Sequence, residues 1–355
     1  MNPRIIIAGG SGFLGGVLAA HFRERGHDIV ILTRKPKTRT DSVRELLWDG
    51  ETLGGWTAEL EGARALINLA GISVNCRYHA RNRKHLLDSR LKSTRVLGEA
   101  IARCTNPPHV WLNSSTATIY KHNFGPAWDE SGEIGGCVEA KDIFSVHVAT
   151  EWERVFFNAR SSRREEAHSF GGGGHADGDQ SLLTSAATVR VRKIALRSAM
   201  VLGHAQNSVL PNMLRLARLG LGGSMSGGRQ FVSWIHHEDF CRAVEWLIEH
   251  EHVSGVVNLA APNPVTNAEF MRAVREICRA PFGLPTPLWL LEIGASFMRT
   301  ETELIIKSRR VMPGRLLHYG FRFQFPELRA AVEDLTAKQT RKIHGAPVSD
   351  PARCG

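Results

Sequence analysis

The chain has 355 residues, of which 43% are hydrophobic and 23% charged, with a net charge of +10. These values fit a globular protein with a full core, in one large α/β domain or two smaller ones, and no apolar run reaches the length of a membrane span. The basic residues are scattered and accompany no known nucleic-acid-binding motif, so we expect no nucleic-acid and no membrane partner. The oligomeric state stays open.

The first elements in chain order form a β-α-β unit. "RIIIAGG" (4–10) predicts a buried strand, "FLGGVLAAHFRERG" (13–26) a helix closed by Gly26, and "HDIVILTR" (27–34) a second buried strand. Because the first strand begins within a few residues of Met1, we expect no signal peptide. The six cysteines form no Cys-x-x-Cys pair. We therefore expect a reducing compartment, the cytoplasm, with an organelle such as the mitochondrion as the alternative.

Further strands alternate with helices. Strands are predicted at "RALINLAG" (64–71), "HVWLNSST" (109–116) and "VRKIALRSAMVLG" (191–203), and a helix over 81–103. Such alternation is typical of an α/β fold, a doubly wound parallel sheet covered on both faces.

Composition shifts divide the rest of the chain. Residues 158–188 contain four successive glycines and many small polar residues, which predicts a disordered insertion. After 263 we expect a helix capped by Thr266 or Asn267, a proline-rich connector (281–287), another helix, a short strand near 320–325 and a last helix. The predicted domains are 1–262, a mostly helical C-terminal module over 263–335, and a disordered tail over 336–355.

Glycines follow the first strand in a spacing that suits a dinucleotide. "AGGSGFLG" places Gly9, Gly12 and Gly15 where a strand ends and a helix begins. One glycine allows a sharp turn, another lets backbone N–H groups approach a pyrophosphate, and the third lets the helix pack closely on the strand. The helix N-terminus adds partial positive charge for the anion. We predict a dinucleotide site, with a purely structural turn as the alternative.

The end of the second predicted strand indicates which dinucleotide. NAD sites usually have a carboxylate there to bind the ribose 2′-OH, whereas this chain has Thr33, Arg34 and Lys35. An Arg fork and a Lys point charge suit a 2′-phosphate, which favours NADP over NAD. The alternative is a solvated basic turn.

Several ordered stretches carry a family resemblance. They are "GGSGFLG", "INLAG", "DSRLKSTR", "LRSAMVLG", "LGLGGSMSGGRQFVSWIHHED", "GVVNLAAPNPVTNAEF" and "SRRVMPGRLLHYGFRFQFPEL". The chain resembles the epimerase-like, atypical branch of the short-chain dehydrogenase/reductase superfamily, sometimes labelled family 39U. The resemblance implies a Rossmann-type core, an NADP ligand and a C-terminal substrate-side module, with a small-molecule substrate held between the sheet's carboxyl edge and that module.

The resemblance also assigns cofactor residues. Thr33 and Arg34 would contact the adenosine phosphate, and Leu69, Ala70 and Arg90 would line the cofactor. Arg90 lies in a basic stretch, where a cation could bind a pyrophosphate or belong to a solvated helix face. The complete set of predicted cofactor contacts is Gly9, Ser11, Gly12, Phe13, Leu14, Gly15, Thr33, Arg34, Lys35, Leu69, Ala70, Gly71 and Arg90.

The superfamily's usual acid, a tyrosine with a lysine four residues later, is absent. Its matching positions hold Phe144 and Val148, and no Tyr-x-x-x-Lys occurs elsewhere. In the usual mechanism the lysine lowers the pKa of the tyrosine, which is otherwise near 10. The remaining catalytic candidates are Ser115, which matches the serine after the preceding strand, and Tyr120 in the loop that follows. Each could instead be a hydrogen-bonded loop residue.

Two further features bear on function. Val232 stands where sugar-nucleotide epimerases have a diphosphate-binding arginine, which weakens an epimerase assignment. "HHED" (236–239) precedes a helical pattern, and we read its carboxylates as helix N-terminal residues rather than metal ligands. We therefore predict an NADP(H)-binding, epimerase-like oxidoreductase without the usual Tyr/Lys pair. The alternative is a non-enzymatic NADP(H) sensor or partner-binding protein.

Overall fold

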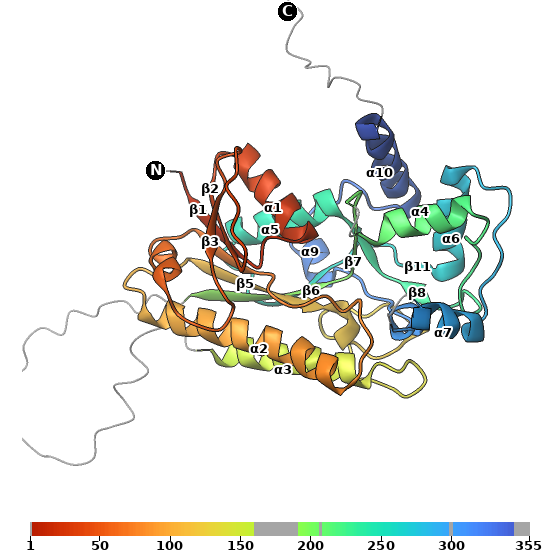
Figure 1. The fold of residues 1–355 in the computed structure, drawn as a ribbon, viewed down its shortest axis with the longest axis horizontal. Helices are drawn as coiled ribbons and strands as arrows, with labels where there is room; N and C mark the ends of the chain where they lie inside the picture. The colour runs from red at the N-terminus through yellow and green to blue at the C-terminus, as the bar shows by residue number, and fades with distance from the viewer. Residues whose placement is uncertain (1, 160–190, 206–207, 298–300, 344–355) are drawn as a thin grey trace, which may run out of the picture. The chain divides into compact units, whose positions relative to one another are not determined.

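The computed structural model describes residues 2–159, 191–205, 208–297 and 301–343 (Figure 1). The predicted insertion over 158–188 and the tail beyond 343 therefore lie almost wholly outside the described residues. The chain divides into two compact units. Unit 1 comprises residues 1–119, 144–197 and 241–257, and unit 2 comprises residues 120–143, 198–240 and 258–355.

Unit 1 is built on a seven-stranded sheet. Its strands are β1 (Arg4–Ala8), β2 (Asp28–Thr33), β3 (Arg44–Leu47), β4 (Ala65–Asn68), β5 (Val110–Thr116), β6 (Arg192–Ser198) and β10 (Gly255–Leu259). The order is β10-β6-β5-β4-β1-β2-β3, and the ladders from β3 through β2, β1 and β4 to β5 are parallel. Because the chain leaves β1 to one side for β2 and returns to its other side for β4, the order reverses at β1.

Helices cover both faces of this sheet. Figure 1 shows α1 (Phe13–Glu24) and α5 (His237–Glu249) on one face, and α2 (Ala80–Arg103) and α3 (Ile143–Asn158) on the other. Strands buried from both sides must be apolar throughout, and Ile5, Ile6 and Ile7 are each 0% exposed. A core cluster with Trp48, Trp56 and Trp111 fills one of these interfaces. The predicted doubly wound α/β fold is confirmed.

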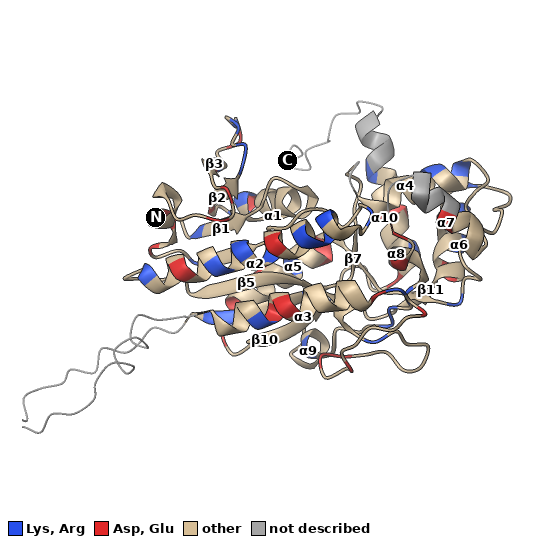
Figure 2. Ribbon diagram, turned by 60° about the horizontal axis from the view of Figure 1, so that its bottom comes forward, with Lys and Arg blue, Asp and Glu red and all other residues tan. Residues whose placement is uncertain are grey.

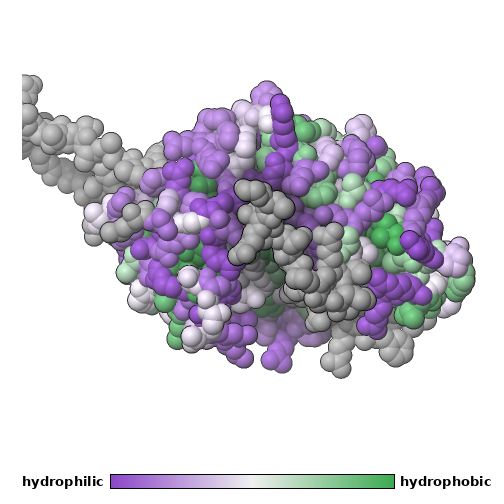
Figure 3. All heavy atoms as spheres, turned by 90° about the horizontal axis from the view of Figure 1, so that it is seen from above, coloured by the Kyte–Doolittle hydropathy of each residue, from purple (hydrophilic) through white to green (hydrophobic). Residues whose placement is uncertain are grey.

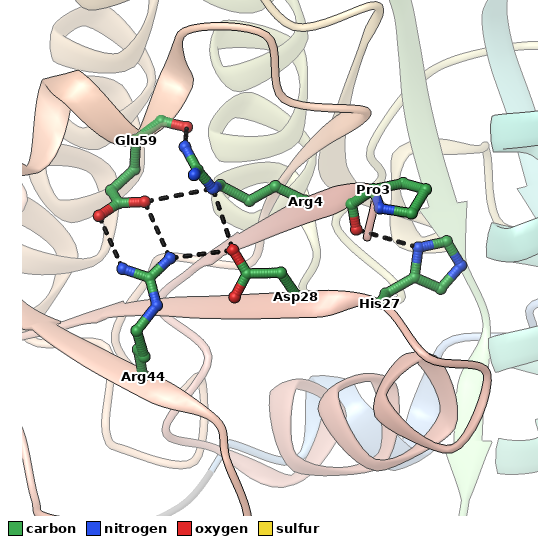
Figure 4. Close-up of polar contacts among 6 residues, drawn as sticks. All are labelled: Pro3, Arg4, His27, Asp28, Arg44 and Glu59. Carbon is green, nitrogen blue, oxygen red and sulfur yellow. Dashed lines mark hydrogen bonds and ion pairs between the residues drawn. The ribbon is translucent and has the colours of Figure 1, made fainter. Parts of the chain in front are cut away.

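Ion pairs connect the amino ends of neighbouring strands of the sheet (Figure 4). Arg4 donates to Asp28 Oδ2 at 3.1 Å, and Arg44 binds both Asp28 at 3.0 Å and the Glu59 carboxylate at 2.8 Å. These charges begin β1, β2 and β3 or lie in the short helix η1 (Gly55–Leu60). The arginines hold the pKa of Asp28 and of Glu59 below its usual range, although burial opposes them in both groups. These two arginines and two carboxylates therefore neutralise one another.

Unit 2 contains two small sheets and six helices among its described residues. The sheets pair β7 (Met200–Leu202) with β9 (Trp234–His236) and β8 (Phe231–Val232) with β11 (Val265–Thr266). The helices are α4 (Val209–Arg218), α6 (Asn267–Cys278), α7 (Leu288–Phe297), α8 (Glu303–Ile306), α9 (Gly314–His318) and α10 (Leu328–Ile343). Its core packs Trp234 against apolar residues of α4, α6 and α10.

The structure corrects several predicted elements. The single strand expected over 191–203 is two, because Ser198 ends β6 and Met200 pairs with Trp234 in another sheet. No strand forms over 320–325; the amides of Gln324 and Phe325 donate to the Asp239 carboxylate at 2.8 and 2.7 Å, which replaces a ladder partner. β3 was not predicted, and α10 extends past Ala337 to Ile343.

The predicted caps agree better with the structure. Thr266 caps α6 in a full capping box with Glu269, which satisfies two orphan amides at once. Gly26 follows α1 with a φ of +80°, the left-handed conformation expected after a helix. Glu238 and Asp239 lie in the first turn of α5, as expected for acidic residues near a helix N-terminus.

The surface carries mixed charge. Figure 2 shows Lys and Arg interspersed with Asp and Glu along α2 and α3, and Figure 3 shows hydrophilic residues over most of the visible face with smaller hydrophobic groups between them. Within the described residues, no helix has both the length and the apolar character needed to cross a bilayer.

Candidate functional site

The loops after β1 and β4 meet at the carboxyl edge of the sheet, on both sides of the point where the strand order reverses. Gly9 has a φ of +73°, and a Cβ there would lie 2.7 Å from Ala70 Cα. Leu69 N donates to Ala8 O at 2.8 Å, so the second loop runs along the first. In open α/β sheets ligands bind at this position.

Each glycine of the first loop has a distinct local reason. A Cβ on Gly15 would lie 2.2 Å from Gly10 O, so α1 packs directly on the loop backbone. A Cβ on Gly12 would meet nothing within 4 Å, so this side of the loop is open to a ligand. Gly10, which we did not predict, is also constrained, because its Cβ would lie 2.9 Å from the Ile7 side chain. The doubled glycine was the signal for it.

The amino end of α1 is open to an anion. Its N-cap is Gly12, which has no side chain to accept from the first amides, and its first turn holds no acidic residue. The helix dipole therefore faces the loop opening uncompensated. Ser11 and Gly12 are exposed, Phe13 and Leu14 are half-buried, and Gly15 is buried. A pyrophosphate fits these donors.

At the carboxyl end of β2, two cations have no acidic partner. Thr33 is buried and its carbonyl accepts from Trp48 N, whereas Arg34 and Lys35 are exposed. In this part of the chain the other arginines are paired: Arg39 binds Asp41 at 2.6 Å, and Arg23 binds the same carboxylate at 3.0 Å. Among the described residues, the Arg34 and Lys35 side chains form no ion pair. They remain available to a phosphate.

Arg90 lies against the second loop. Its guanidinium donates to Leu86 O at 2.9 Å and Ile72 O at 3.2 Å and lies over the Trp152 ring at 5.2 Å. Gly71 packs on it, since a Cβ there would be 3.3 Å from Arg90 Cζ. Burial lowers the pKa of Arg90 to about 10, while Tyr78 and Cys76 oppose the shift. No carboxylate pairs with it in the described part of the chain, which suits a role as a phosphate ligand.

Ser115 takes part in a buried charged network. Its hydroxyl donates to Glu153 Oε1 at 2.5 Å, and Arg197 binds both oxygens of the same carboxylate at 2.8 and 2.7 Å. All three side chains are less than 10% exposed. Because the Ser115 hydroxyl proton is already donated to Glu153, this hydroxyl could only accept a hydrogen bond from a substrate. Sequence reasoning missed Glu153 and Arg197, although Arg197 lies in "LRSAMVLG", one of the stretches that carry the family resemblance.

Tyr120 is buried within unit 2. It is 1% exposed, and its hydroxyl donates to Asn258 Oδ1 at 2.8 Å. Asn258 is itself fixed, because its backbone amide donates to Glu130 and its side chain to Met312 O. The predicted acid/base role of Tyr120 therefore requires this bond to break during reaction.

The positions of the missing Tyr/Lys pair are apolar and packed. Val148 is 8% exposed on α3, and the Phe144 ring lies 5.3 Å from the Tyr78 ring in an edge-on arrangement. The Arg83 guanidinium lies 5.0 Å from the Phe144 ring centroid.

A buried polar ladder, also missed from the sequence, holds the loops in place. The Asn68 side chain donates to Asn113 Oδ1 at 2.7 Å and to Thr94 Oγ1 at 3.3 Å, and its Oδ1 accepts from Ala70 N at 3.0 Å. Trp152 Nε1 donates to Thr94 Oγ1 at 3.0 Å. The ladder links β4, β5, α2 and α3 below the candidate site.

The histidines of "HHED" are buried in unit 2. His236 lies 3.3 Å from Asp334 Oδ2, its Nδ1 accepts from Glu238 N, and its ring packs on Phe325. Burial lowers the pKa of His236 to about 4 and of His237 to about 3. No cluster of three or more His, Cys, Asp or Glu side chains that could hold a metal occurs in the described ranges.

These pKa shifts predict acid sensitivity. Both histidines are neutral when folded, whereas the unfolded chain takes up protons below pH ~6.5, so stability falls as the pH drops from there towards 4. We expect the free energy of unfolding at pH 4.5 to be lower than at pH 7 by roughly 2 kcal/mol or more. Urea unfolding at both pH values measures this. His237→Phe should flatten the dependence and the exposed His85→Gln should not; equal slopes in all three proteins would contradict it.

The chain matches known proteins along nearly its whole length. Residues 5–134 match the NAD dependent epimerase/dehydratase family, and residues 286–335 match a domain of unknown function, DUF1731. The epimerase family protein SDR39U1 of Bos taurus is 31% identical over 338 residues, which cover 94% of this chain and 100% of the relative. The epimerase family protein YfhF of Bacillus subtilis (strain 168) is 27% identical and covered to 98%.

Solved structures agree with these matches. The crystal structure of human SDR39U1 (isoform2) with NADPH is 27% identical, with a TM-score of 0.74 over 94% of this chain and 99% of that one. UDP-N-acetylglucosamine 4-epimerase from Bacillus cereus, at 16% identity and a TM-score of 0.68 over 98% of this chain and 99% of that one, shares the fold.

The sheet order and the glycine loop define a Rossmann-fold protein of the short-chain dehydrogenase/reductase class. Similarity over the full length then narrows this class, because both the core and the C-terminal DUF1731 module are present in the right order. The chain belongs to the SDR39U1 family of epimerase-like proteins.

Proposed function

We propose that this chain is an NADP(H)-binding, epimerase-like oxidoreductase acting on a small molecule. The observation that carries the proposal is the set of groups around the glycine loop that have no carboxylate partner among the described residues: the open end of α1, Arg34 with Lys35, and Arg90. The α1 amides and Arg90 would hold the pyrophosphate, and Arg34 and Lys35 the 2′-phosphate. The bound nicotinamide would supply a hydride donor or acceptor.

Two observations favour a non-enzymatic NADP(H) sensor as the second candidate. Ser115 and Tyr120 are both buried with their hydroxyl protons engaged, and the usual Tyr/Lys positions are apolar. A screen of carbonyl and alcohol metabolites with NADPH and NADP⁺ separates the candidates. Turnover that falls in Ser115→Ala while cofactor affinity is kept supports the enzyme, whereas binding without any turnover supports the sensor.

We place the protein in the cytoplasm. The five cysteines of the described residues form no disulfide with one another, in keeping with a reducing compartment. Imaging of the tagged full chain tests this.

Arg34→Ala tests the cofactor assignment. Loss of a charge-assisted contact to phosphate removes roughly 1.5–3 kcal/mol, so NADPH affinity should fall about 10- to 100-fold. NADH has no 2′-phosphate, and its affinity should change less than about 2-fold. Fluorescence titration measures both. Arg39→Ala is the matched control, because Arg39 is paired with Asp41 and Glu45; equal loss in both variants would show a general charge effect and contradict the assignment.

A further inference from the structure

Tyr78 lies in the loop that leads from β4 to α2, at the carboxyl edge of the sheet. The chain has three tyrosines, and Tyr78 is the one whose position belongs to unit 1, which also contains the glycine loop. Tyr120 is buried in unit 2, and Tyr319 ends α9 there. Tyr78 is half-buried, so a ligand at this edge can reach it.

The ring of Tyr78 packs beside the position that lost its acid. Its centroid is 5.3 Å from that of Phe144 with an interplanar angle of 69°, an edge-to-face contact. The backbone is fixed as well, because Arg83 Nε donates to Tyr78 O at 2.6 Å and Asn82 donates to Arg77 O at 2.8 Å. These contacts fix the Tyr78 ring beside Phe144.

Two arginines of α2 lie close to the Tyr78–Phe144 pair. Arg83 comes from the first turns of α2 and lies over the Phe144 ring, 5.0 Å from its centroid. Arg90 lies about two turns further along the same face of α2. Tyr78 is among the groups that favour the charged form of Arg90. A cation near a phenol stabilises the phenolate and makes proton transfer possible nearer neutral pH. In the superfamily a lysine does this for the tyrosine at the Phe144 position.

We propose that Tyr78 is the proton donor and acceptor of this protein, with Arg83 and Arg90 supporting its phenolate in place of the missing lysine. This inference rests on the oxidoreductase function proposed above. In the reductive direction the substrate carbonyl carbon takes a hydride from the reduced nicotinamide, and its oxygen takes the Tyr78 proton. The C=O π bond breaks, C–H and O–H bonds form, the carbonyl is reduced and the cofactor oxidised. Water then returns a proton to the phenolate.

The test measures the phenol directly, without substrate. Tyrosinate absorbance is recorded against pH for the full chain and for Tyr78→Phe, which keeps the ring packing; the difference between the two curves isolates Tyr78. We expect the absorbance lost in Tyr78→Phe to appear at least one pH unit below ~10, the value of an ordinary tyrosine. Tyr319→Phe should retain that low-pH component.

Charge-removal variants identify the cause. Arg83→Gln should move the low-pH component upward by about 0.5 to 1 pH unit, whereas Lys84→Gln, which removes an exposed charge paired with Asp88 on the same helix, should not. A difference curve that rises only at pH ~10 or above would overturn the proposal. So would a low-pH component that Arg83→Gln leaves in place.

NADPH titration of the same proteins keeps this inference separate from the proposed function. If NADPH binds both the wild-type chain and Tyr78→Phe, and only the wild-type chain shows the low-pH tyrosinate component, both the proposed function and the role of Tyr78 are supported. If NADPH binds but the wild-type chain shows no low-pH tyrosinate component, only the role of Tyr78 is overturned. Absence of NADPH binding overturns the proposed function, whatever the phenol does. With any carbonyl that the screen identifies, Tyr78→Phe should lower kcat at least 100-fold and leave KM within about 3-fold.

Discussion

Gly15→Ala is expected to destabilise unit 1 by about 3 kcal/mol or more and to abolish cofactor binding. The added Cβ would lie 2.2 to 2.4 Å from the backbone of Gly10, where no side chain can move aside. Overpacking against backbone displaces the elements themselves, so α1 must shift away from the loop. Denaturant unfolding measures the loss of stability, and fluorescence titration measures the loss of NADPH affinity.

The neighbouring glycines provide two matched controls. Gly16→Ala lies on the same helix, where a Cβ meets nothing within 4 Å, so both stability and NADPH affinity should be kept. Gly12→Ala also meets nothing and has an ordinary φ of −88°, so stability should change by less than about 1 kcal/mol. Its methyl group would project into the opening of the loop, however, and NADPH affinity should fall at least 10-fold. If Gly12→Ala binds NADPH normally, the loop does not hold the pyrophosphate.

The structural roles of Gly9, Gly12 and Gly15 were predictable because the reasons for them are local. A strand, a turn and a helix follow one another in "RIIIAGGSGFLG", and the spacing alone tells which position must turn and which must pack. The same holds for Thr266 and Glu269, whose capping box needs only four residues. Arg34 was predictable for a related reason, since the residue after β2 falls at the carboxyl edge once the strand is recognised.

The polar interior was not predictable, because its partners are distant in sequence. Glu153 looks like any acidic residue on a helix, and only the fold brings it to Ser115 on β5 and Arg197 on β6. Tyr120 was a candidate acid because the family resemblance places a tyrosine in this loop, yet its hydroxyl bonds to Asn258, 138 residues away. The missing strand at 320–325 has the same origin, since Asp239 supplies acceptors that no local pattern reveals.

Glu153→Ala should strongly destabilise unit 1. It leaves the Arg197 guanidinium, which is 4% exposed, without its two-oxygen partner, and breaking a buried pair from one side costs about 3–5 kcal/mol. Ser115→Ala removes a single hydrogen bond to the same carboxylate and should cost about 1–3 kcal/mol. Denaturant midpoints of the two variants test this order.

Two further variants decide whether the charge is the cause. Glu151→Ala on the same helix removes an exposed carboxylate paired with Arg154, and should change stability by less than about 1 kcal/mol. Glu153→Met combined with Arg197→Met removes both charges at similar volume, and should recover much of the loss because no buried ion remains. If the double variant is as unstable as Glu153→Ala, the network stabilises unit 1 through its shape and hydrogen bonds. Recovery would instead show that the ion pair serves mainly to orient Ser115, whose proton it holds away from any bound substrate.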